Sequence, residues 1–128
     1  GMGGMGGMGG MQDCVEDGDY VEIEVDLENT GVLLSATGEA EWSMHSNRVE
    51  FSMEIEGVPV GSYPLKVGGT EVGVIEAFEM HYGDVYGHIR FRDPETQGRE
   101  HLDFEPRGQL IEVLQGEDVI LSVLFPEE

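Results

Sequence analysis

The chain has 128 residues and a mass of 14.0 kDa, with 27 acidic against 6 basic side chains and a formal net charge of −21. This length suits one hydrophobic core and leaves no room for a second full domain. The absence of any run of about 18 apolar residues excludes a membrane-spanning helix. The negative charge disfavours nucleic acid and anionic membranes as partners, because both repel an acidic surface.

The chain begins with a low-complexity segment. Residues 1–11 read GMGGMGGMGGM, and glycine at this density supports neither helix nor strand. The segment also lacks the positive region and apolar stretch of a signal peptide. We therefore expect a flexible Gly/Met-rich tail over residues 1–13 and a single β domain over residues 14–128.

Apolar and acidic residues alternate from Tyr20 onward. In residues 20–27 and again in residues 48–56, every second residue is apolar and most of the others are acidic. A period of two predicts a strand with one face in a core and the other in water. Asn29-Thr30-Gly31 predicts a turn, and residues 32–42 predict a further strand with an irregularity at Gly38.

A pair of glycines further along the chain predicts a hairpin. A two-residue loop at Gly68-Gly69 places Lys66, the only lysine, opposite Glu71, and it places Tyr63 opposite Val74.

The last predicted hairpin, residues 110–125, turns near Gly116 and is apolar on both faces, which is typical of strands covered on both sides. A loop, the N-terminal segment or another subunit is a candidate cover for Ile120 and Leu124. We expect self-association there, giving a homodimer.

These short strands, punctuated by glycine and proline, predict an all-β fold. We expect an antiparallel β-sandwich or a partly closed barrel of about eight or nine strands. Aromatic side chains at strand period are typical core residues, and we expect this role for Trp42, Phe51, Phe78, Phe91 and Phe125.

Two stretches carry a resemblance. Residues 58–75, VPVGSYPLKVGGTEVGVI, and residues 102–121, LDFEPRGQLIEVLQGEDVIL, resemble strands of uncharacterised β-sandwich modules of exported bacterial proteins. Together they cover under half of the chain. The resemblance implies a β-sandwich in an exported or periplasmic setting, and it brings no catalytic residues with it.

A first candidate metal site is the tail. Four thioethers spaced by two residues on a flexible chain favour a soft ion such as Cu(I) or Ag(I), and a nearby thiol adds a stronger ligand. The candidate ligands are Met2, Met5, Met8, Met11 and Cys14. The alternative is a linker of accidental low complexity.

A second candidate depends on a two-residue hairpin loop at Gly83-Asp84. That register places Glu79 opposite His88 and His81 diagonal to it. Two imidazoles and a carboxylate are ligands for Zn(II), Cu(II) or iron. A slip of one residue changes these neighbours, and solvated side chains on an exposed strand are the alternative.

No arrangement of residues compels an enzyme. The acidic neighbours of Cys14 disfavour a thiolate, and the serines and histidines show no nucleophile motif. We therefore expect a non-enzymatic binding or structural module without a cofactor. The alternative is a soft-metal binding protein that uses the methionine repeat. The third hypothesis is a hydrolase or metal-dependent enzyme that uses Glu79, His81 and His88.

Overall fold

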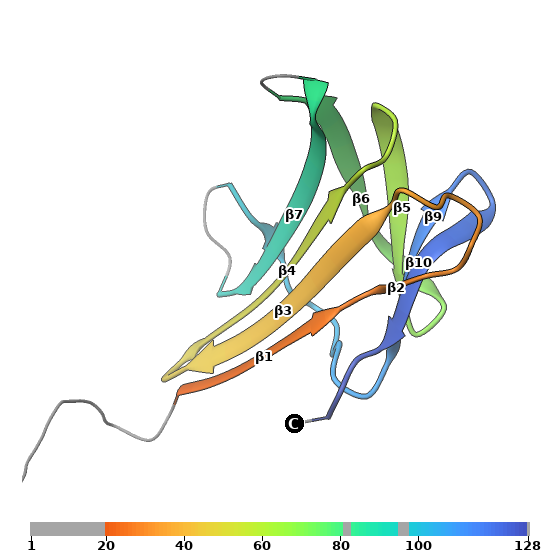
Figure 1. The fold of residues 1–128 in the computed structure, drawn as a ribbon. Coiled ribbons are helices and arrows are strands. Elements are labelled where there is room, and N and C mark those ends of the chain that lie inside the picture. Colours follow the sequence, from red (N-terminus) through yellow and green to blue (C-terminus); the bar gives the residue numbers. More distant parts are fainter. Residues whose placement is uncertain (1–19, 81–82, 95–97, 128) are drawn as a thin grey trace, which may run out of the picture.

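The computed structural model of the chain describes residues 20–80, 83–94 and 98–127. Its elements are ten strands joined in one sheet, and these residues form no helix that is both long and apolar enough to cross a membrane (Figure 1). The strands are β1 (Tyr20–Asp26), β2 (Glu28–Asn29), β3 (Thr37–His45), β4 (Arg48–Glu56), β5 (Gly61–Val67), β6 (Thr70–Glu79), β7 (Val85–Asp93), β8 (Glu100–His101), β9 (Leu110–Gln115) and β10 (Asp118–Leu124).

The sheet is nearly closed on itself. Its strand order is β1-β3-β4-β7-β6-β5-β9-β10-β2, with β8 added in parallel to β7, and every other pair is antiparallel. Only Leu27 separates β1 from β2, yet these strands lie at opposite ends of this order. One continuous segment thus approaches both edges, which confirms the all-β prediction in its barrel-like form (Figure 1).

The inner face carries the apolar half of the alternating strands. Phe51, Met53 and Ile55 of β4 are buried, as predicted from the period of two. Trp42, Phe91 and Phe125 are buried in the same core, but Phe78 is 47% exposed and packs edge-on against Tyr86 on the outside. The prediction that Phe78 is a core residue is therefore wrong.

The hairpin at Gly68-Gly69 forms as predicted, with Lys66 opposite Glu71. A bulge between Leu65 and Lys66 then shifts the register by one residue, so Tyr63 lies opposite Ile75 and not opposite Val74. Because each one-residue shift exchanges the two faces, Ile75 enters the core and Val74 faces outward.

The next hairpin differs from its prediction. Glu79 pairs with Val85, so the connection between paired residues spans residues 80–84 instead of Gly83-Asp84 alone. The Met80 amide donates to the Asp84 carbonyl at 2.5 Å and closes this longer loop.

The strand expected over residues 32–42 begins only at Thr37. The Asn29 side-chain amide donates to the carbonyls of Leu33 and Ala36, at 2.7 and 3.0 Å, and its oxygen accepts from the Gly31 amide at 2.7 Å. These bonds satisfy the backbone locally and hold residues 30–36 as a loop.

The final hairpin also contains a bulge, between Val119 and Leu121. Ile120 and Leu121 consequently both lie in the core, each with 0% exposure. The prediction that Ile120 offers a surface for self-association is wrong for this reason. Leu124, by contrast, is 67% exposed.

Candidate functional site

The outer surface of β1, β3 and β4 is a continuous acidic surface. Alternation turns three carboxylates of β1, two of β3 and three of β4 outward, while their apolar neighbours face the core. We call this surface the carboxylate face, and it consists of Glu22, Glu24, Asp26, Glu39, Glu41, Glu50, Glu54 and Glu56.

The register places several of these carboxylates directly opposite one another. Glu24 pairs with Glu41, and Glu39 lies between Asp26 on one side and Glu54 on the other. Like charges at directly opposed positions of antiparallel strands destabilise a sheet. Folding therefore brings together carboxylates from three strands that are separated along the chain.

Proton affinity reflects this crowding. The pKa of Glu41 is raised from 4.5 to about 7, because the carboxyl hydrogen bonds to Glu22, is partly desolvated and is surrounded by Glu22, Glu24 and Glu39. The pKa of Glu39 is also raised, first by desolvation and then by the charge of Glu24.

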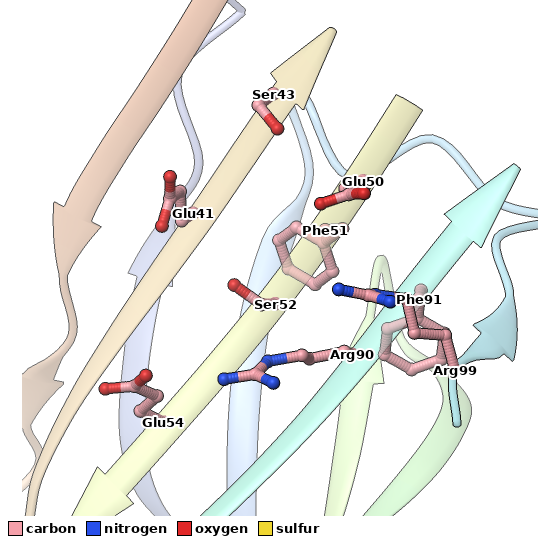
Figure 2. A pocket seen from close by; sticks show the side chains of 9 residues that line it. All are labelled: Glu41, Ser43, Glu50, Phe51, Ser52, Glu54, Arg90, Phe91 and Arg99. Carbon is pink, nitrogen blue, oxygen red and sulfur yellow. The ribbon is translucent and has the colours of Figure 1, made fainter. Parts of the chain in front are cut away.

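A shallow pocket of about 180 Å³ lies on this face, where β3 and β4 meet β7. Figure 2 shows Arg90 reaching from β7 toward Ser52 and Glu54 on β4, while the rings of Phe51 and Phe91 lie beneath the surface. The lining residues are Glu41, Ser43, Glu50, Phe51, Ser52, Glu54, Arg90, Phe91 and Arg99. The arginines border the carboxylate face on one side.

Two further contacts define that border. The Glu50 carboxylate lies 3.7 Å from the Arg48 guanidinium and 3.8 Å from that of Arg92. Away from the arginines, a second hollow of about 170 Å³ is lined by Asp26, Thr37, Gly38, Glu39, Glu54 and Glu56, in which each charged side chain is acidic. Acidic and basic side chains therefore meet around Glu50, whereas the hollow at Asp26 and Glu39 is lined by acidic charges alone.

A wider hollow of about 820 Å³ opens between residues 35–37, the end of β4 and the start of β7. Met80 and Gly83 line it, and residues 81 and 82 between them lie outside the described part of the chain. We assign no site to this hollow.

Of the two candidate metal sites, the structure describes only Glu79 and His88 of the second. Met2, Met5, Met8, Met11 and Cys14 lie outside the described residues, and so does His81. His88 lies between Glu76 of β6 and Glu54 of β4, whereas Glu79 lies opposite Val85. Over residues 20–80, 83–94 and 98–127, no group of three His, Cys, Asp or Glu side chains is arranged to hold a metal ion.

Sequence reasoning recognised the outward acids of residues 20–27 and 48–56 without joining them into one site. The missing information was that β3 lies between them, contributing Glu39 and Glu41. The segment GEAEWS carries the same alternation and is the local signal that points to it.

No family model matches this chain, and no curated protein matches its sequence. The resemblance to exported bacterial modules, and the setting that it implies, stay predictions.

Proposed function

We propose that the chain is a non-enzymatic binding module whose carboxylate face binds a cationic segment of a protein or peptide. The observation that carries this proposal is the direct opposition of Glu39 to both Asp26 and Glu54, together with that of Glu24 to Glu41. Lysine or arginine side chains placed over these pairs relieve repulsion that the free domain retains.

The shape of the face supports recognition of a large partner. Sites for small molecules are typically clefts of about 300–1,000 Å³ that enclose most of the ligand. The pocket on the carboxylate face holds about 180 Å³ and lies on the outside of the sheet. An extended partner that lies across several strands buries more of such a surface than a small molecule does.

The overall charge supports the same function. At −21 the chain attracts cationic partners from a distance and repels anionic ones. Because exposed charges are screened over about 8 Å at physiological ionic strength, binding to this face should weaken as salt increases.

The test uses acetylated, amidated heptalysine and the full chain in isothermal titration calorimetry at low and at raised salt. We compare two triple variants of equal charge, each reduced from −21 to −18 by the loss of three carboxylates. The face variant carries Glu24→Gln, Glu39→Gln and Glu54→Gln, and the control carries Glu71→Gln, Glu117→Gln and Glu127→Gln.

We expect saturable, salt-sensitive binding that the face variant weakens by at least about tenfold and the control by less than about threefold. Equal weakening by the two variants means that net charge, and not this face, attracts the peptide. That result, or the absence of saturable binding, contradicts the proposal.

A further inference from the structure

We propose that the partner segment binds as an added β-strand along the free edge of β1, and that it alternates basic with apolar side chains. This inference rests on the proposed function and specifies how the partner docks and what sequence it needs. Four observations support it. They are the open edge, the direction of its backbone groups, the chemistry of its two faces, and the like charge that a second copy of the chain would bring to it.

The edge is open because the sheet stops short of full closure. β2 pairs with β10 through only two positions, Asn29 with Leu121 and Glu28 with Ser122. Toward the N-terminus the pairing ends, and within the described residues β1 pairs with β3 alone. Figure 1 shows β1 and the C-terminal end of β10 running apart. Among the residues that the structure describes, one side of β1 is therefore left without a paired strand.

The hydrogen bonds on both sides of this segment show which residues face the open edge. The Leu27 amide donates to the Gly38 carbonyl at 2.9 Å, toward β3, whereas the Thr30 amide donates to the Ile120 carbonyl at 3.1 Å, toward β10. In an antiparallel ladder this direction alternates from residue to residue. The amides and carbonyls of Glu22, Glu24 and Asp26 consequently point to the open edge.

The two faces of β1 determine the partner's sequence. The outward side chains at the edge are Glu22, Glu24 and Asp26, and the inward ones include Val21, which is 39% exposed, and the half-buried Ile23 and Val25. A strand added here sets every second side chain beside a carboxylate and the others over this apolar row. Lysine or arginine suits the first positions, and valine, isoleucine or leucine suits the second.

A second copy of the chain fits this edge poorly. Antiparallel pairing of two β1 strands would bring their carboxylates side by side across the new ladder, which is unfavourable. Acidic side chains on an edge strand are one way in which proteins prevent such self-pairing. The charge on the edge thus favours a basic partner.

The test titrates the ¹⁵N-labelled full chain with the acetylated, amidated heptapeptide KVKVKVK, which matches the seven residues of β1. Its control, KKKKVVV, has the same composition without alternation. We expect the alternating peptide to bind at least about tenfold more tightly and to shift the amide signals of Glu22, Glu24 and Asp26. Equal affinity, or shifts confined to other strands, overturns strand addition.

Backbone methylation gives a sharper test. In antiparallel pairing the lysines opposite the β1 carboxylates turn their own amides toward β1, and the valine amides point away. Methylating the lysine amides should abolish binding, and methylating the valine amides should not. The reverse pattern supports a parallel added strand, while equal effects of the two methylated peptides overturn the inference.

A substitution in the protein tests the same edge. Glu24→Pro removes a charge and an edge amide that makes no bond to β3, and Glu24→Gln removes the charge alone. Strand addition predicts that the proline variant binds KVKVKVK about tenfold more weakly than the glutamine variant. Equal affinities of the two folded variants overturn it, and the methylated peptides decide the matter if Glu24→Pro does not fold.

These results separate the two proposals. If heptalysine and KKKKVVV bind the carboxylate face as tightly as KVKVKVK does, the proposed function stands and strand addition fails. If none of the three peptides binds saturably, the proposed function fails as well.

Discussion

The Arg107 guanidinium lies over the Trp42 ring, 4.1 Å from its centroid, and thereby covers the only tryptophan of the chain. Hydrogen bonds of 2.8 and 3.0 Å from Arg107 to the Glu105 carboxylate orient the guanidinium. A cation in this position over an indole stabilises a fold by about 0.5–2 kcal/mol. Arg107 therefore closes the core beside a buried ring.

We expect Arg107→Gln to lower the free energy of unfolding by about 0.5–2 kcal/mol and to shift the fluorescence of Trp42 to longer wavelength. Urea titration followed by emission measures both effects. Arg48→Gln is the matched control, because the Arg48 ion pair with Glu50 is exposed and 3.7 Å long, and such pairs contribute little. An unchanged Trp42 spectrum in Arg107→Gln would contradict this account.

Gly87 of β7 lies opposite Ala77 of β6. A Cβ at this position would sit 2.9 Å from the Ile75 side chain, 3.0 Å from the Glu76 carbonyl oxygen and 3.2 Å from the Ala77 Cα. Backbone atoms cannot move aside cheaply, so Gly87→Ala should destabilise the fold by about 1–3 kcal/mol. Thermal unfolding measures the loss, and Ser122→Ala, on the outer face of β10, should stay within about 0.5 kcal/mol of the parent chain.

The hydrogen bond between the Glu41 and Glu22 carboxyl groups predicts that the stability of the fold decreases as the pH rises. The pKa of Glu41 is raised from 4.5 to about 7 in the folded chain. Between these values the folded state holds a proton that the unfolded state has released. The contribution is complete below about pH 4.5 and is lost as the pH rises through about 7.

Glu41→Gln should flatten this dependence, since an amide does not titrate. Because Glu41 is only half-buried and solvent screens its interactions, we expect a difference below about 1 kcal/mol. Urea unfolding at intervals from about pH 5 to about pH 8 measures the slope, and Glu71→Gln controls for the loss of one charge. A slope that is the same in both variants would show that Glu41 does not hold the proton.

Self-association through the final hairpin depends on Leu124, since Ile120 is in the core. Leu124 lies opposite Leu110, and both side chains are exposed. A dimer through this pair predicts a sedimentation mass above 14.0 kDa that falls toward the monomer in Leu124→Asp. Leu34→Asp, at another exposed leucine, should leave the mass unchanged. If the parent chain already sediments as a monomer, the prediction of a dimer is wrong.

The methionine repeat predicts binding of a soft ion independently of the domain. Ag(I), which requires no reductant, should shift the methyl signals of Met2, Met5, Met8 and Met11 saturably, while core methyl signals such as that of Met53 stay in place. Replacing the four tail methionines by leucine should abolish the effect. Shifts that never saturate would favour a plain linker.

The alternation of residues 20–27 and 48–56 is enough to predict strands and their inner faces. A glycine pair is enough to predict the hairpin that sets Lys66 opposite Glu71. These features are local, because side-chain direction in a strand has a period of two and a tight turn restricts the backbone at its own residues. Local patterns of this kind are sufficient to determine the fold class.

Tertiary pairing decided the rest. The bulges at Leu65 and Ile120 exchange inner and outer positions through contacts with other strands, and no local period records them. The site likewise depends on β3 lying between β1 and β4, which brings Glu39 between Asp26 and Glu54. In β1 and β4, which contain no bulge, the sequence alone determined which side chains point outward. Only the order of strands in space determined which of them meet, because that order is set by pairing between residues distant in the chain.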